Sequence, residues 1–232
     1  MILNLNKYSY NKLSRCDHKD GRQYVLPNGE KTVSVTTILS KTKDITHLLE
    51  WKKRIGEDKA KQITEESAGL GTTMHAHLEA YILGQERPGG NNYGRLMAKK
   101  MADTIIAEGL VEVNEAWGVE AHLNYDTMWA GTTDLVGMYN GEPAIMDFKT
   151  TIKPKKREWV EDYKLQLAAY AMAHNLNYGT DIKTTVVFMV SRECEFQKFV
   201  WTGEEFEQST LQWAQRVSDY YEKHVFNVLS SQ

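Results

Sequence analysis

The chain has 232 residues, 41% of them hydrophobic, and a formal net charge of −3. This length suffices for a single domain with a sizeable core. Cys16 and Cys194 are too few for a disulfide framework, a Cys-based zinc site or a four-Cys iron–sulfur cluster, and they are typical of a reducing compartment. No apolar run approaches the roughly 18 residues of a membrane span, and the N-terminus lacks a secretory pattern. We therefore expect a cytoplasmic protein with no membrane partner.

Residues 1–40 are expected to form a small β-rich unit at the start of the domain, because short strand-like runs alternate there with turn residues. Ser34, Thr36 and Thr37 come at its end, before an apolar pair. Their hydroxyl groups suit the cap of a helix, and they also suit a phosphate held at a helix N-terminus. Both roles stay open at this point.

A histidine is the first candidate metal ligand. Thr72 or Thr73 can cap a helix that runs to Leu83, and on it His75 and Glu79 lie four residues apart and share one face. His75 is either a neutral imidazole ligand or a core or capping residue.

A β-hairpin is predicted over residues 130–151. Its strand-like runs, 132–139 and 143–150, are separated by Asn140 and Gly141. This dipeptide is typical of a type I′ turn, which needs positive φ at both central residues. A turn of two residues fixes how the strands pair.

This pairing brings two carboxylates together. If Tyr139 pairs with Glu142, Asp134 lies directly opposite Asp147, with Cβ atoms roughly 4.5–5.5 Å apart. Lys149 points to the same face as Asp147, because side chains alternate along a strand. Two like charges on a mostly apolar sheet are costly unless a cation joins them or one is protonated. The residues indicate either a divalent metal site beside Lys149 or an ordinary ion pair at a strand end.

A strand over residues 111–123 leads into the hairpin, and Glu120 lies on its polar face. Glu120 either neighbours the carboxylate pair or is an outward polar residue. After the hairpin, Gln166 and Tyr170 lie four apart on one face of a helix predicted over residues 158–175.

The loop between hairpin and helix is rich in basic residues. Such a loop beside an acidic pocket suits contact with a phosphate backbone, although a solvated run of charges is the common alternative. The candidate contacts here are Thr150, Lys153, Lys155, Lys156 and Arg157.

The remaining elements follow from periodicity and turn residues. They are helices over residues 44–64 and 93–109, strands over 180–191 and 196–201, and a C-terminal helix over 203–232.

Four motifs in a fixed order resemble those of the RecB-type branch of the PD-(D/E)XK nuclease superfamily. They are His75, then Gly131-Thr-Thr-Asp134, then Asp147-Phe-Lys149, then Gln166-Leu-Ala-Ala-Tyr170. The order and spacing are far more specific than any one motif. Within the branch, the Ser34-Val-Thr-Thr37 and Gly71-Thr-x-x-His75 stretches look closest to phage exonucleases and the mitochondrial genome maintenance exonuclease.

The resemblance implies an α/β fold with a restriction-endonuclease-like core in the order αβββαβ, in which helices flank a central mixed sheet. It also implies a metal-dependent DNA exonuclease that uses Mg²⁺ or Mn²⁺ and prefers single-stranded ends. The host cytoplasm would be the location if a phage encodes the chain.

The resemblance further implies a role for each matching residue. His75, Asp134, Asp147 and the backbone oxygen of Phe148 would be metal ligands. Lys149 would orient or deprotonate the attacking water, and Gln166 and Tyr170 would help position the pocket and the DNA. Glu79 and Glu120 are left as candidates to support the ligands from outside.

Three other functions were compared with the nuclease prediction. A non-catalytic nucleic-acid-binding module on the same fold would normally have lost Asp147 or Lys149, and both are present. An endonuclease on the same fold stays an alternative. A zinc enzyme that uses His75 and His77 together is excluded, because residues two apart face different sides of a helix.

Overall fold

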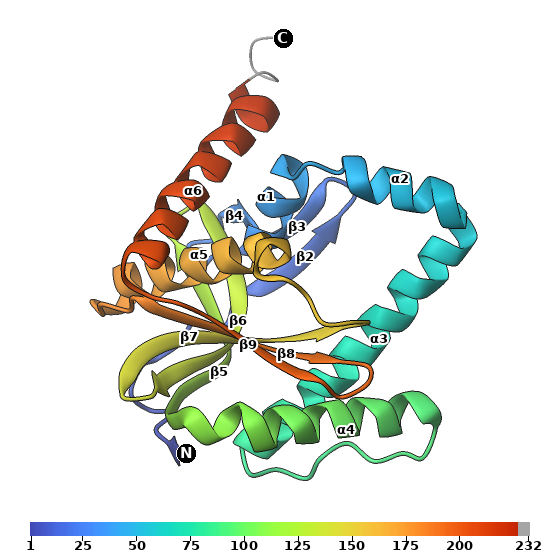
Figure 1. Ribbon diagram of the computed structural model, residues 1–232. Helices are drawn as coiled ribbons and strands as arrows, with labels where there is room; N and C mark the ends of the chain where they lie inside the picture. The colour runs from blue at the N-terminus through green and yellow to red at the C-terminus, as the bar shows by residue number, and fades with distance from the viewer. Residues whose placement is uncertain (227–232) are drawn as a thin grey trace.

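The structure is a computed structural model, and it describes residues 1–226 (Figure 1). Its centre is a six-stranded mixed sheet in the order β1-β5-β6-β7-β8-β9. The strands are β1 (Ile2–Leu3), β5 (Val113–Tyr125), β6 (Trp129–Tyr139), β7 (Glu142–Thr151), β8 (Thr184–Ser191) and β9 (Phe196–Trp201). Strands β5, β6 and β7 pair antiparallel, whereas β7 and β8 pair in parallel. The predicted mixed sheet is confirmed.

Helices cover both faces of this sheet. They are α1 (Val35–Thr42), α2 (Thr46–Ile55), α3 (Glu57–Ile82), α4 (Tyr93–Glu108), α5 (Glu161–Tyr178) and α6 (Gly203–Tyr221). Helices α3 and α4 pack on one face and α1, α5 and α6 on the other, so that two hydrophobic cores form (Figure 1). The order αβββαβ is confirmed as α3 and α4, then β5, β6 and β7, then α5 and β8. Residues 227–232, at the end of the predicted C-terminal helix, lie outside the described residues.

A second, three-stranded sheet lies between β1 and α1 in the chain, within residues 1–40, where we expected a β-rich unit. Its strands are β2 (Ser14–His18), β3 (Gly21–Val25) and β4 (Lys31–Val33), in that order. The hydroxyl groups of Tyr24 and Thr132 lie 3.2 Å apart and join this sheet to β6. Three short helices, Leu110–Glu112, Arg157–Val160 and Glu222–Phe226, complete the described elements. Among residues 1–226, no helix has the length and apolar character needed to cross a membrane.

The hairpin has the predicted register, because Tyr139 pairs with Glu142. Its two faces divide as expected. Val136 and Ile145 belong to the core under α5, whereas the core under α3 and α4 contains residues such as Leu135 and Met146.

The pairing stops earlier than predicted at the open end of the hairpin. The last pair is Leu135 with Met146. We expected Asp134 to pair with Asp147 in the ladder, and it does not. The reason is local: the backbone N–H of Phe148 donates to Asp134 Oδ2 at 2.7 Å, and that N–H is the one a longer ladder would use.

Helix α3 is also longer than predicted. It starts at Glu57 and continues through Gly69 and Gly71, while the break falls at Gly56, whose φ of 88° suits glycine. Thr72 therefore does not cap the helix, and its hydroxyl donates to the carbonyl oxygen of Ala68 at 3.0 Å. Burial of the α3 side chains against α4 outweighs the cost of about 1 kcal/mol for each interior glycine.

Candidate active site

A cleft of about 950 Å³ opens beside the metal-ligand candidates. Helix α3 forms one wall, and residues of β5, β6 and β7 form the floor. Helix α5 and the three-stranded sheet form the remaining side, so the cleft draws on segments from across the chain. His75 and Glu79 both line the α3 wall, as their shared helix face predicts, whereas His77 is buried elsewhere.

Three side chains in this cleft form a potential metal site. One ligand atom from each of His75, Glu120 and Asp134 lies within 4.8 Å of the other two, among the described residues. His75 Nδ1 is 3.4 Å from Asp134 Oδ1. In the β5–β6 ladder Val119 pairs with Leu135 and Ala121 with Thr133, so Glu120 lies across from Asp134. This position decides between the two predicted locations of Glu120. It neighbours the carboxylates rather than facing away.

The protonation of this cluster reflects an excess of negative charge. Burial and the nearby Asp134 raise the pKa of Glu120 to about 7. Burial alone would lower the pKa of His75, but Asp134 outweighs it and raises the pKa to about 9. Burial would raise the pKa of Asp134, but the positive charges of His75 and Lys149 leave it lowered. In the absence of a cation, protons on Glu120 and His75 thus offset the negative charge of the cluster.

Two carboxylates and one imidazole are donors that suit Mg²⁺ or Mn²⁺, since hard cations favour oxygen and manganese also accepts nitrogen. Binding would require His75 and Glu120 to release their protons. The residues present therefore fit a divalent cation.

Asp147 and Lys149 lie next to the cluster and pair with each other. Asp147 is only 2% exposed, and Lys149 Nζ forms an ion pair with its Oδ2 atom. Burial and the charge of Asp134 raise the pKa of Asp147 to about 6. Burial would lower the pKa of Lys149, but Asp147 and Asp134 outweigh burial and raise it. Lys149 Nζ also lies 5.2 Å from the centre of the Tyr163 ring, a contact that favours the charged form of the lysine.

Gln166 and Tyr170 approach the cleft from α5, as predicted. Gln166 Nε2 donates to the Tyr170 hydroxyl at 3.2 Å. A Cβ atom on Gly131 would lie 2.5 Å from Tyr170 Cε1, so the glycine of the Gly-Thr-Thr-Asp motif makes room for the tyrosine. Burial raises the pKa of Tyr170, which keeps its hydroxyl protonated.

The family model described as the PD-(D/E)XK nuclease superfamily matches residues 46–229. The chain belongs to this superfamily. The four ordered motifs, from His75 to Tyr170, all fall within the matched region, and the predicted membership is confirmed.

Two curated proteins similar to this chain are named Mitochondrial genome maintenance exonuclease 1. The Homo sapiens protein is 27% identical over 210 residues, covering 82% of this chain and 58% of the relative. The Mus musculus protein is 26% identical over 203 residues, covering 82% and 59%. The chain thus spans less than two thirds of the length of these relatives. A solved phage related exonuclease from Haemophilus somnus 129PT gives a TM-score of 0.42 at 10% identity, covering 85% of this chain and 96% of that chain.

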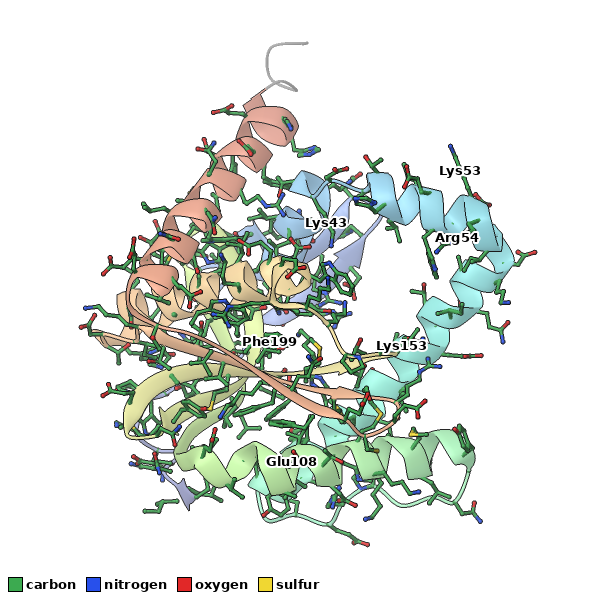
Figure 2. The ribbon with its side chains drawn as sticks, in the orientation of Figure 1. Lys43, Lys53, Arg54, Glu108, Lys153 and Phe199 are labelled. Carbon is green, nitrogen blue, oxygen red and sulfur yellow. The ribbon has the colours of Figure 1, made fainter. Side chains whose placement is uncertain are left out.

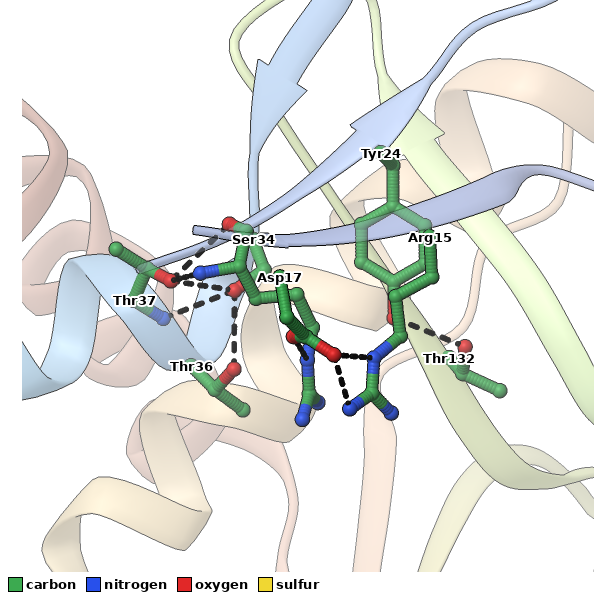
Figure 3. Close-up of polar contacts among 8 residues, drawn as sticks. Arg15, Asp17, Tyr24, Ser34, Thr36, Thr37 and Thr132 are labelled. Atoms are coloured by element: carbon green, nitrogen blue, oxygen red, sulfur yellow. Dashed lines mark hydrogen bonds and ion pairs between the residues drawn. The ribbon is translucent and has the colours of Figure 1, made fainter. Parts of the chain in front are cut away.

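The hydroxyl residues at the start of α1 serve as a cap. Ser34 Oγ accepts the backbone N–H of Thr37 at 3.0 Å, and the Ser34 and Thr36 hydroxyls lie 3.0 Å apart (Figure 3). Ser34 and Thr36 also line the cleft, whereas Thr37 is buried and bonds to the backbone of Arg22. Ser34 is only 1% exposed and its hydroxyl serves the cap, so Thr36 is the residue whose hydroxyl is open to a ligand.

The basic loop contributes less to the cleft than its composition suggested. Thr150 lines the cleft, and Lys155 lines an adjoining hollow of about 340 Å³. Lys153 lies where the loop approaches α3 (Figure 2). Lys156 pairs with a neighbouring acid, and Arg157 Nη2 is 2.7 Å from a carboxylate oxygen on α6. The last two residues do not line the cleft.

Several cleft residues on the three-stranded sheet, and in the segment just before it, were not predicted from the sequence. These are Lys12, Arg15 and Arg22, which carry positive charge. Strand β2 has mostly exposed polar residues without apolar alternation, so no periodic signal marked it.

Proposed function

We propose that this protein is a metal-dependent DNA exonuclease that hydrolyses phosphodiester bonds and prefers single-stranded ends. The observation that carries the proposal is the cluster of His75, Glu120 and Asp134 beside the Asp147–Lys149 pair in one cleft. Membership of a nuclease superfamily supports it, as do two curated relatives whose names describe exonucleases.

His75, Asp134, Asp147 and the Phe148 carbonyl would hold Mg²⁺ or Mn²⁺, with Glu120 close enough to join them. A bound divalent cation supplies an activated water and offsets charge that develops on the phosphate. The protein supplies a fixed set of donors, because the Phe148 N–H holds one Asp134 oxygen in place. Glu79, farther along the α3 wall, supports the site from outside.

Lys149 orients the attacking water and stabilises negative charge on the phosphate in the transition state. Its pairing with Asp147 keeps it charged and directs its side chain. Gln166 and Tyr170 position the reacting strand as a bonded pair. Thr36 and Thr150 offer hydroxyl donors to its phosphates, and Lys153 and Lys155 in the loop add positive charge near the rim.

The test is a time course on end-labelled single-stranded DNA with Mg²⁺ or Mn²⁺. We expect cleavage that a chelator stops and that Lys149→Ala or Asp147→Asn lowers about a hundredfold or more, because each removes charge stabilisation from the transition state. Lys183 lies just before β8, at the far end of that strand from Met189, which pairs with Lys149. Lys183→Ala removes this exposed lysine, and the variant should cut at the wild-type rate.

Full activity of folded Lys149→Ala would contradict the assignment. A covalently closed single-stranded circle separates the two nuclease classes: an exonuclease leaves it intact, and rapid cutting would indicate an endonuclease. Binding of DNA without any cleavage under both metals would favour the non-catalytic module instead.

A further inference from the structure

The positive charge inside the cleft comes mainly from one wall. Among the described residues, the lysine and arginine side chains that line it are Lys12, Arg15, Arg22 and Lys149. Lys149 is already paired with Asp147. The other three belong to the N-terminal sheet and the segment that leads into it. They line the same cleft as α3, from a different element.

Asp17 holds the two arginines side by side. Arg15 Nη2 lies 2.7 Å from Asp17 Oδ2, and Arg22 Nε lies 3.1 Å from Asp17 Oδ1 (Figure 3). An arginine has five N–H donors, so both guanidinium groups keep free donors after these bonds. Their side chains remain 50% and 34% exposed. With Lys12, the group carries three positive charges against one negative charge.

This sheet is fixed to the strands that carry the metal-ligand candidates. The Tyr24 hydroxyl lies 3.2 Å from Thr132 Oγ1, and the backbone N–H of Leu13 donates to His122 Nδ1 at 3.1 Å. Thr132 is two residues from Asp134, and His122 is two residues from Glu120. The arginines are therefore held at a constant place relative to the reacting centre.

Carboxylates line the cleft as well. Glu79, Glu120 and Asp134 line it near the metal-ligand candidates, and the whole chain has a net charge of −3. A nucleic-acid strand is a polyanion, so local positive charge must offset this repulsion before the strand can enter. Arg15 and Arg22 supply that charge, and their planar donor groups match phosphate oxygens.

We infer that Lys12, Arg15 and Arg22 form a binding site for the backbone phosphates of the substrate strand. The site holds one stretch of the strand against the N-terminal sheet while the bond to be cut lies at the cluster of His75, Glu120 and Asp134. Thr36, beside Ser34 on the same cleft, adds a hydroxyl donor. This inference rests on the proposed function, whose residues did not include these three side chains.

The test measures binding rather than cleavage. Fluorescence anisotropy of a labelled single-stranded DNA oligonucleotide, with chelator present to keep it intact, gives Kd over a series of salt concentrations. We expect Arg15→Ala and Arg22→Ala each to bind about tenfold more weakly, since a hydrogen bond to a charged group is lost. The slope of log K against log salt should fall by about 0.7 for each lost phosphate contact.

Conservative and control variants show whether charge is the cause. Arg15→Lys should keep the salt slope while losing some affinity, because it keeps the charge but not the planar donors. Lys183→Ala, from an exposed ion pair outside the cleft, should keep both Kd and slope. Unchanged melting temperatures would show that each variant is folded.

Two oligonucleotides, with a 5′-phosphate and with a 5′-hydroxyl, identify the phosphate. Equal losses on both support contact with internal phosphodiesters, and a loss on the phosphorylated strand alone supports contact with a terminal phosphate. Wild-type Kd and salt slope in both arginine variants would overturn the inference while the cleavage assay still stood. A wild-type protein that neither binds nor cuts DNA would overturn the proposed function, and this site with it.

Discussion

Asp147 is more deeply buried than Asp134 and Glu120, the other acids beside it. It is 2% exposed, and its pKa is raised to about 6 by burial and by the charge of Asp134, despite the ion pair with Lys149. A raised pKa means that the folded protein disfavours the charged carboxylate relative to the unfolded chain. Above pH 6, the charged form therefore lowers the free energy of unfolding.

Asp147→Asn should thus leave the metal-free protein at least as stable as wild type at pH 8. The variant should gain little from Mg²⁺ or Mn²⁺, whereas wild type should gain about 2.7 kcal/mol at a free metal concentration near 100 times Kd. Thermal melts of both proteins with chelator and with metal measure these differences. Equal upward shifts in both proteins would show that Asp147 is not part of the metal site.

Glu120 lies across from Asp134 and belongs to the potential metal site itself. Glu120→Gln should weaken Mn²⁺ binding about tenfold or more, because it removes a charged oxygen donor near the ion. Isothermal titration calorimetry measures this directly, without any need for activity. Glu79→Gln, on the α3 wall but outside that group, is the matched comparison and should have the smaller effect. The reverse order would assign the metal contact to Glu79.

Glycines determine how two of the elements fit together. Gly131 in β6 lies against the buried Tyr170 of α5, where a Cβ atom would come within 2.5 Å of the ring. Apart from its chain neighbours and the backbone of its own helix, Gly69 in α3 has no atom within 4 Å of its Cβ position. The same substitution should therefore have opposite effects at these two positions.

Gly131→Ala should lower the free energy of unfolding by about 1–3 kcal/mol, because the core must shift to accept the methyl group. Gly69→Ala should raise it by about 0.5–1 kcal/mol, because alanine favours a helix interior. Urea denaturation of the two variants and wild type provides the comparison. A destabilised Gly69→Ala would argue against a continuous α3.

Three groups at the site have raised pKa values and should make the stability of the metal-free protein depend on pH. Asp147, Glu120 and His75 have ordinary pKa values of 3.8, 4.5 and 6.5, which the fold raises to about 6, 7 and 9. A raised pKa contributes stability below the unfolded value, and this contribution is lost as pH rises through the folded value. Asp134, whose pKa is lowered, acts in the opposite direction and loses its contribution only in acid.

The three raised groups should make the metal-free protein less stable as pH rises from about 4 to about 9. Mn²⁺ should reverse this trend at the upper end, because a cation binds the deprotonated forms. Melting temperatures across this range, measured with chelator and with Mn²⁺, should diverge as pH rises. Two parallel curves would show that these groups do not bind the metal together.

The sequence by itself determined the local features of this protein. The Asn140-Gly141 turn fixed the register of the hairpin because only two residues close it, and alternation then assigned each side chain to a face. Helical spacing likewise placed His75 on the cleft face of α3 and His77 away from it. The order of the motifs was enough to predict the superfamily and the αβββαβ core.

Tertiary structure decided what depends on contacts between distant segments. Packing against α4 stabilises α3 as a continuous helix across its interior glycines, although glycine intrinsically disfavours a helix. Glu120 meets Asp134 through the β5–β6 register, which the longer turn between those strands left open in the sequence. Arg15 and Arg22 reach the cleft because the N-terminal sheet docks on β6, and no periodic signal in the sequence marked β2. In each case many weak contacts across the chain outweigh the local preference, and no short stretch of sequence contains them.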